Sequence, residues 1–182
     1  MQLRHAEPSR DAAACAEIYA PFVADSVISL EVVPPGPEEF ARRIERISTR
    51  YPWLVAELGD EMAGFAYGSL HRERAAYRWA AESTVYIDPA HQRRGIGRSL
   101  YLALFDLLRR QGLQIVYAGI TLPNRASVAL HEALGFELVG VYRRIAWKFG
   151  AWHDVGWWQL DLVPPEPQAP PEPGPPVRLD QR

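Results

Sequence analysis

Apolar side chains recur along this chain at two different spacings. In four segments they fall three and four positions apart, which places them on one face of an α-helix. Pro37 precedes the second of these segments, and Gly112 and Gly135 follow the last two, as is common where helices begin and end. The pattern predicts helices over residues 11–23, 40–51, 97–111 and 124–134.

Short apolar runs between the helical segments predict β-strands. Gly59-Asp60 separates the first two runs and favours a β-hairpin, and Asp88-Pro89 ends the third. Antiparallel hairpins therefore come first and strand–helix–strand units follow, which predicts a mixed α/β fold with a single central sheet flanked by helices. The predicted strands cover residues 53–57, 62–70, 83–87, 114–120, 136–142 and 155–162.

The composition changes sharply at Pro164. Eight of the residues from Pro164 to Arg182 are proline and none is aromatic, so this stretch cannot bury enough apolar surface to offset the entropy lost on ordering. The chain is therefore predicted to form one domain, residues 1–163, followed by a disordered or extended tail, residues 164–182. A proline-rich ligand for a recognition domain is the alternative interpretation of the tail.

Charge and composition argue against several functions. The net charge is −2, without the basic excess typical of nucleic-acid binders. The longest apolar run, residues 100–105, is too short to span a bilayer, and no signal-peptide core is visible at the N-terminus. The single cysteine, Cys15, excludes a disulfide within the chain, and the histidines show no metal-ligand spacing. We expect a cytoplasmic protein without metal, nucleic-acid or membrane partners, in which Cys15 is a small buried hydrophobe.

One glycine- and arginine-rich loop, residues 92–97, lies between a predicted strand and a predicted helix. Two glycines allow the backbone to turn tightly and approach a ligand, and the helix start offers free N–H groups to a pyrophosphate. No Gly-Lys-Ser/Thr follows, and the strand over residues 114–120 does not end in the acidic residue that holds a dinucleotide ribose. A plain turn is the other interpretation. Three arginines add positive charge: Arg93, Arg94 and Arg98.

The sequence Gln92-Arg93-Arg94-Gly95-Ile96-Gly97 resembles the acetyl-CoA loop of the GNAT acetyltransferase family, Gln/Arg-x-x-Gly-x-Gly/Ala. Residues 124–136 resemble that family's later helix and the turn behind it. Residues 50–57, 82–87 and 152–156 are similar to one branch, which acetylates phosphinothricin, methionine sulfoximine or methionine sulfone. The likeness covers residues 3–162 and implies the GNAT fold and an N-acetyltransferase activity.

The resemblance also implies that acetyl-CoA is the co-substrate. Backbone groups of one strand would pair with the pantetheine arm as an added strand would, and the loop would surround the pyrophosphate. Asn124 is equally typical of a helix cap, and the two roles are compatible because they use different atoms. The cofactor-binding residues implied are Val85, Tyr86, Ile87, Arg93, Arg94, Gly95, Ile96, Gly97, Arg98 and Asn124.

Glu82 and His131 match the catalytic carboxylate and histidine proposed for this branch. Acyl transfer from a thioester to an amine requires loss of a proton from the ammonium, stabilisation of the carbonyl oxygen and departure of a thiolate. Glu82 suits the general base if partial burial raises its pKa, whereas His131 could be the acid, the base or an orienting residue. A backbone N–H near Tyr86 or Ile87 is the expected donor to the oxyanion. Apart from the resemblance, a solvated glutamate and a structural histidine are the ordinary interpretations.

The resemblance further implies an acceptor pocket lined by Arg74, Tyr77 and Tyr86. A guanidinium can hold a carboxylate or phosphinate through two hydrogen bonds, although Arg74 could equally be a solvated charge on a loop. Leu30 and Ala20 stand where the branch usually has an aromatic residue and an asparagine. We therefore expect the sulfoximine or the sulfone to be acetylated at least as well as phosphinothricin.

Other functions stay open from the sequence. A non-catalytic sensor that binds CoA or acetyl-CoA could use the same loop, and an enzyme could instead acetylate a different amine or a protein N-terminus. Acetylation of phosphinothricin would imply herbicide resistance. We also expect a homodimer, with the last tryptophans either in the core or at the subunit interface: Trp147, Trp152, Trp157 and Trp158.

Overall fold

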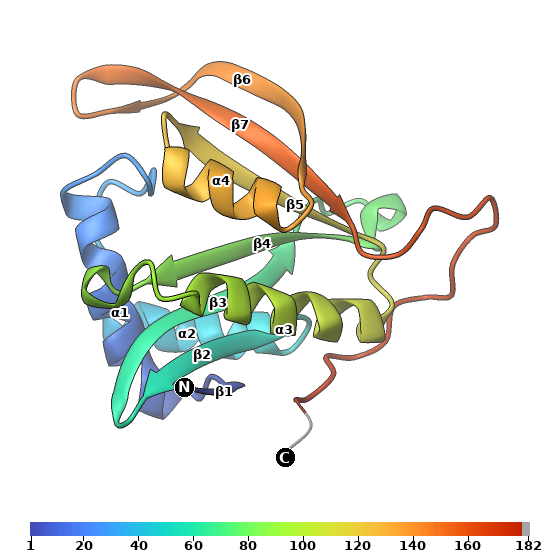
Figure 1. Cartoon of the computed structure of the whole chain (residues 1–182), viewed down its shortest axis with the longest axis horizontal. Helices are drawn as coiled ribbons and strands as arrows, with labels where there is room; N and C mark the ends of the chain where they lie inside the picture. Colours follow the sequence, from blue (N-terminus) through green and yellow to red (C-terminus); the bar gives the residue numbers. More distant parts are fainter. Residues whose placement is uncertain (180–182) are drawn as a thin grey trace.

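The computed structural model describes residues 1–179 and contains one mixed sheet in the strand order β1-β2-β3-β4-β5-β7-β6 (Figure 1). This confirms the expected mixed α/β architecture with a single central sheet flanked by helices. None of the helices in this part of the chain has the length and apolar character needed to cross a membrane. The elements are β1 (Gln2–His5), α1 (Pro8–Ala24), α2 (Pro37–Ser48), β2 (Trp53–Leu58), β3 (Glu61–Leu70), η1 (Ala75–Tyr77), β4 (Ala80–Ile87), η2 (Pro89–His91), α3 (Ile96–Gln111), β5 (Ile115–Leu122), α4 (Arg125–Ala133), β6 (Glu137–Lys148) and β7 (Ala151–Asp161).

The sequence pattern misses two features of the sheet. Strand β1 has four residues and pairs antiparallel with β2 at the edge of the sheet, and a run that short and polar carries no period to detect. The last two strands also extend further than expected and form one long hairpin that turns at Phe149 and Gly150, both with positive φ. Exposed apolar residues on β6 interrupt the alternation that would have indicated this extension.

Two apolar layers hold the helices against the sheet. Helices α1 and α2 cover one face through side chains that include Ile18 and Ile44. Helix α3 covers the other face through a row that includes Leu100, Leu104 and Leu108, and α4 packs partly buried apolar side chains on the same layer. Side chains of β4 therefore alternate between the two layers, which places the site residues of this strand on both faces of the sheet.

The sheet opens beyond the short parallel pairing of β4 and β5. These two strands pair from Ala80↔Ile115 to Glu82↔Tyr117 and then diverge, as Figure 1 shows. Strand β5 continues along β7 to Leu122, whereas residues 83–87 of β4 keep pairing with β3 and have no strand partner on their other side within the described chain. This divergence exposes a strand edge in the middle of the molecule.

The described part of the tail, residues 164–179, contains no helix or strand and lies along the domain. Gly174 donates its backbone N–H to the carbonyl of Gln111 at 2.7 Å, and the Trp79 indole N–H donates to the carbonyl of Pro171 at 2.8 Å. Leu179 packs against the core layer under α3. The division of the chain at residue 163 stays a prediction, and the last three residues of the expected tail lie outside the described residues.

Candidate functional site

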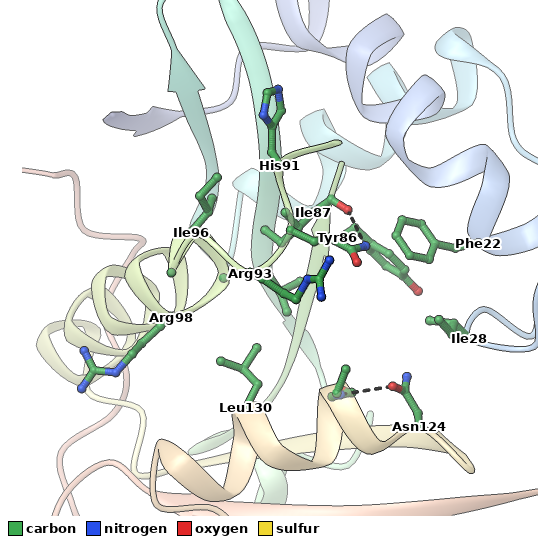
Figure 2. A pocket seen from close by; sticks show the side chains of 16 residues that line it. Phe22, Ile28, Tyr86, Ile87, His91, Arg93, Ile96, Arg98, Asn124 and Leu130 are labelled. Atoms are coloured by element: carbon green, nitrogen blue, oxygen red, sulfur yellow. Dashed lines mark hydrogen bonds between the residues drawn. The ribbon is translucent and has the colours of Figure 1, made fainter. Parts of the chain in front are cut away.

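A cavity of about 350 Å³ lies where β4 leaves β5, beside the start of α3 (Figure 2). Its walls are the free edge of β4, the loop over residues 91–95, the first turns of α3 and α4, and the side chains of Phe22 and Ile28. We call it the cofactor cavity. One end is lined by arginine and backbone N–H groups and the other by apolar side chains, so the cavity suits an elongated ligand with one anionic end.

The loop before α3 has a backbone conformation that suits an anionic ligand. Gly95 lies at the N-cap with φ +78°, and Arg93 also has a positive φ of 61°. No side chain caps the helix and its first turn has no acidic residue, so the first N–H groups of α3 are free for an anionic ligand. Figure 2 shows the Arg93 side chain extending across the cavity and Arg98 turning outward from it.

Nine of the ten cofactor-binding residues expected from the sequence line this cavity, and the tenth does not. Arg94 is exposed and lies outside the lining, although its two neighbours belong to it. Asn124 performs the capping role, because its Oδ1 accepts the backbone N–H of Ser127 at 3.1 Å (Figure 2). Its amide NH₂ is then left for a ligand, so the capping and binding roles are compatible. Binding by these residues stays a prediction.

Glu82 stands at the last paired position of β4 and β5, and its side chain is 28% exposed. Burial raises the pKa of this carboxyl, against the lowering effects of a hydrogen bond from His71 at 3.0 Å and of the nearby Arg72 charge. A carboxylate with a raised pKa at the mouth of a cavity is suited to accept a proton near neutral pH.

Glu82 lines a second cavity of about 390 Å³, which we call the acceptor cavity. It is bounded by β4, by residues 28–31 of the loop between α1 and α2, and by side chains of α1, β5 and β7. The acceptor cavity shares Ile28 and Tyr86 with the cofactor cavity, so the two meet at β4. The acceptor cavity therefore extends along β4 from Glu82 to the wall that it shares with the cofactor cavity.

His131 lies in a different environment and is only 3% exposed. Its Nδ1–H donates to the carbonyl of Ser127 at 2.7 Å, and its Nε2 then accepts the Tyr101 hydroxyl at 3.1 Å. Desolvation lowers the pKa of His131, which keeps the ring neutral. The ring also packs edge-on against Phe136, in the core layer under α3. It borders a small cavity of about 100 Å³ together with Tyr101, Asn124 and Ser127.

The acceptor residues expected from the sequence are not all brought together. Tyr86 lines the acceptor cavity, but Arg74 and Tyr77 are exposed and lie outside its lining. The centroid of the Tyr77 ring is 6.2 Å from that of His71, whose Nδ1 contacts Glu82, so this loop lies close to Glu82. Substrate binding by Arg74 and Tyr77 stays a prediction.

Sequence reasoning missed a hydrogen-bonded network that shapes the acceptor cavity. The Tyr19 hydroxyl contacts Ser29 Oγ at 2.6 Å and donates to Glu31 at 2.8 Å. Arg43 donates twice to the Glu31 carboxylate, at 2.7 and 3.0 Å. Burial favours a higher pKa for Glu31, but these hydrogen bonds hold that pKa below its usual range. Glu31 is therefore a paired anion with a lowered pKa, whereas the pKa of Glu82 is raised.

A buried lysine fixes the loop that carries this network. Lys148, at the end of β6, donates to the carbonyls of Val23, Ser26 and Ser29 at 2.6, 2.8 and 2.7 Å. The three acceptors lie more than one hundred residues away in the sequence, so no local signal could have indicated the contact. The hairpin of β6 and β7 thus holds one wall of the acceptor cavity.

The four late tryptophans divide between core, site and surface. Trp158 is buried, and Trp157 lines the acceptor cavity with its ring over Gly119, where a Cβ would come within 3.3 Å of the indole. Trp147 and Trp152 are each 57% exposed on the hairpin.

Cys15 is fully buried and burial raises the pKa of its thiol, which confirms the interpretation of Cys15 as a small hydrophobe. Residues 1–179 contain no cluster of three potential metal ligands from His, Cys, Asp and Glu.

Comparison with known proteins agrees with this geometry. An acetyltransferase (GNAT) domain model matches residues 4–157. A phosphinothricin N-acetyltransferase of Streptomyces viridochromogenes is 44% identical over 163 residues, which cover 90% of this chain and 89% of that protein. An L-methionine sulfoximine/L-methionine sulfone acetyltransferase of Salmonella typhimurium is 39% identical over 112 residues, 62% of this chain and 66% of that protein. This chain also resembles a solved structure, the crystal structure of a GNAT superfamily phosphinothricin acetyltransferase from Sinorhizobium meliloti in complex with acetyl-CoA. The two superpose with a TM-score of 0.88 and are 34% identical in sequence. The match covers 94% of this chain and 93% of that one.

Proposed function

Because this chain belongs to the acetyltransferase (GNAT) family and is an acetyl-CoA-dependent N-acetyltransferase, we propose that it acetylates the amino group of a small amino acid-like acceptor. The acceptors we propose are phosphinothricin, methionine sulfoximine and methionine sulfone, which appear in the names of its relatives. The observation that carries the proposal is the position of Glu82, half-buried in the acceptor cavity at the point where the free edge of β4 begins.

The residues of the cofactor cavity fit acetyl-CoA. The uncapped start of α3, with Arg93 and Arg98 beside it, would hold the pyrophosphate. The unpaired edge over residues 83–87 offers backbone donors and acceptors to the amide groups of the pantetheine arm, as in the addition of a strand to a sheet. The acetyl thioester at the end of this arm supplies the acyl group for transfer.

Glu82 is proposed to act as the general base. Its carboxylate takes a proton from the acceptor ammonium, and the free amine attacks the thioester carbon. A C–N bond then forms and the C–S bond breaks, and the second proton lost by the nitrogen passes to the departing thiolate. A backbone N–H near Tyr86 or Ile87 would stabilise the charge on the carbonyl oxygen. Hydroxyl groups of Thr84 and Ser127 line the small neighbouring cavity and can donate hydrogen bonds to the departing thiolate.

His131 is proposed to orient Tyr101 rather than to exchange protons. Both of its ring nitrogens have partners, and its lowered pKa disfavours the imidazolium. Burial raises the pKa of Tyr101, so this hydroxyl keeps, near neutral pH, the proton that it donates to Nε2 of His131. Of the three roles that the sequence left open for His131, the orienting role agrees best with this geometry.

Arg74 is proposed to bind the anionic end of the acceptor, and Tyr77 to close over it. Within the described residues, Arg74 is exposed and makes no ion pair, so its guanidinium is available to a ligand. The carboxylates that line the acceptor cavity, Glu31 and Glu82, attract an ammonium but no anion. A cationic side chain from outside the lining of the acceptor cavity is therefore needed to bind the carboxylate of an amino acid.

We further propose that two copies of the chain associate through the hairpin of β6 and β7. This outer hairpin exposes eight large apolar side chains, more than single soluble domains commonly leave uncovered on one element. Light scattering should give twice the mass of the chain, and Val139→Glu should reduce it to one copy. A monomeric wild type would overturn this proposal. The exposed residues are Leu138, Val139, Val141, Tyr142, Ile145, Trp147, Phe149 and Trp152.

Location and physiological effect follow from the proposed reaction. The dependence on acetyl-CoA supports the proposal that the enzyme acts in the cytoplasm, where this co-substrate is available. If phosphinothricin is acetylated, a host that expresses the protein should become resistant to that herbicide.

The substrate proposal is tested by thiol release from acetyl-CoA. The assay compares kcat/KM for phosphinothricin, methionine sulfoximine and methionine sulfone, with methionine and glutamate as controls. We expect the sulfoximine or sulfone to equal or exceed phosphinothricin, because Leu30 replaces the branch's aromatic residue and so should remove a flat wall and reshape the cavity near the acceptor's side chain. A higher value for a polyamine, an aminoglycoside or a peptide N-terminus would refute the acceptor class. Acetyl-CoA binding without turnover of any amine would indicate a sensor instead.

A further inference from the structure

His71 lies directly beside the proposed base. It follows the last residue of β3, and its Nδ1 is 3.0 Å from Oε1 of Glu82. The His71 side chain is 12% exposed, so the bond is largely shielded from water. An ionised carboxylate only accepts hydrogen bonds, so Nδ1 carries the proton and donates it.

Aromatic rings fix the orientation of this imidazole. It stacks on Tyr117 of β5 with ring centroids 4.4 Å apart and an interplanar angle of 16°. Trp157 of β7 meets it edge-on at 6.1 Å, and Tyr77 does so at 6.2 Å from the opposite loop. A ring held on three sides keeps its Nδ1–H aimed at one oxygen of Glu82.

We propose that His71 is a positioning residue for Glu82, whose Nδ1–H holds Oε1 and leaves Oε2 for the proton of the acceptor ammonium. The proposal rests on the proposed function, in which Glu82 is the base. One proton passes from the ammonium nitrogen to Oε2 and then to solvent, while His71 keeps its own proton. Neither sequence spacing nor the family resemblance indicated a role for His71.

The charges around Glu82 make this donor important. Burial alone would favour the protonated carboxyl, and the opposing influences on its pKa are the hydrogen bond and charge of His71 and the charge of Arg72. Across the acceptor cavity, Glu31 is already paired with Arg43. Four phenols also lie near Glu82, and burial raises their pKa values, so they are uncharged near neutral pH: Tyr19, Tyr67, Tyr86 and Tyr117.

Two substitutions separate the hydrogen bond from the ring. His71→Phe keeps a flat ring over Tyr117 and removes the N–H, whereas His71→Asn keeps a short N–H donor and removes the ring. With any amine that the wild type accepts, His71→Phe should lower kcat/KM about tenfold near pH 7, the loss typical of a hydrogen bond to a charged group. In the pH profile of kcat/KM, the acid limb of His71→Phe should move to higher pH than that of the wild type. The KM for acetyl-CoA should stay unchanged. His71→Asn should keep the acid limb near its wild-type position.

A second measurement needs no turnover. The carboxyl carbon of Glu82 is followed by NMR in protein labelled with ¹³C-glutamate, and its signal is identified by its loss in Glu82→Gln. We expect the pKa of Glu82 to rise in His71→Phe and to change little in His71→Asn. This titration reports on the pairing even if the acceptor has been misassigned.

The outcomes distinguish the two proposals. A His71→Phe enzyme with wild-type kcat/KM and an unshifted Glu82 titration would overturn the positioning role, and a defect confined to His71→Asn would show that ring packing is the actual contribution. A wild type inactive on every amine, with the Glu82 titration still responding to His71→Phe, would overturn the proposed function and support the pairing.

Discussion

Glu82 and Tyr117 form the last parallel pair between β4 and β5, and the sheet opens immediately beyond them. Glu82 thus stands where the strand edge becomes free, in the acceptor cavity, which meets the cofactor cavity further along β4 at Tyr86. Tyr117 carries the stacked His71 ring that contacts the Glu82 carboxylate. A single topological step therefore positions the proposed base, its hydrogen-bond donor and the edge for the cofactor arm.

The first prediction concerns the turn before α3. Gly95 has φ +78°, a conformation that β-branched residues strongly disfavour, and no atom lies within 4 Å of the place where a Cβ would stand, so the constraint is conformational. Gly95→Val should raise the dissociation constant for acetyl-CoA about tenfold, since relaxing the strain moves the N–H groups of the loop. Isothermal titration calorimetry measures the change.

Gly59 is the matched control for this substitution. It has φ +66° in the β2–β3 turn, again with open space around the Cβ position, but it does not line the cofactor cavity. Gly59→Val should therefore cost stability while leaving acetyl-CoA affinity near the wild-type value. An equal loss of acetyl-CoA affinity in both variants would contradict the assignment of the loop before α3 to cofactor binding.

The second prediction concerns the pH dependence of stability through His131. Its pKa is lowered by burial, so the unfolded state takes up a proton below about pH 6.5 before the folded state does. This group's contribution to stability is present above that pH and is lost as the pH falls through and below it. The stability advantage of the wild type over His131→Phe should thus be smaller at pH 5.5 than at pH 7.5 in urea unfolding.

Tyr101→Phe provides the comparison for His131. It removes the same 3.1 Å hydrogen bond but retains the buried histidine. This variant should lose about 1 kcal/mol of unfolding free energy. Its stability should still fall between pH 7.5 and pH 5.5, because the buried histidine is still present. An identical pH response in the two variants would show that His131 is not the titrating group.

The third prediction concerns Lys148. Lys148→Met removes three hydrogen bonds to backbone carbonyls and leaves these acceptors without their donor, which should lower the unfolding free energy by about 2–4 kcal/mol. The loop that carries Ser29 and Glu31 should loosen, so the KM of the acceptor should rise more than that of acetyl-CoA. Steady-state kinetics with each substrate varied in turn checks this, and equal changes in both KM values would argue against it.

Much of the fold could be predicted from the sequence because its signals are local. The helices follow a regular apolar spacing, and glycines with positive φ end α3 and the turn after α4. The edge strand β1 and the tip of the last hairpin carry no such period, so they became visible only in the structure.

The site divides in the same way. The cofactor loop and Glu82 lie in contiguous motifs, whereas the roles of His71 and Lys148 depend on contacts between segments far apart in the chain. Arg94 shows the limit of a contiguous motif, because a residue within it lies outside the cavity that its neighbours line. Such placements depend on the backbone turn at Arg93 and Gly95, which residue types alone do not specify.

The most direct test of the account is the turnover of Glu82→Gln with the best acceptor of the wild type. The amide cannot take a proton from the ammonium, so kcat should fall about 10²–10⁴-fold at pH 7 while the dissociation constant for acetyl-CoA stays unchanged. The acid limb of the wild-type profile should also disappear, because the raised pKa of Glu82 produces it. A loss of less than about tenfold, with the acid limb intact, would contradict the assignment of Glu82 as the base.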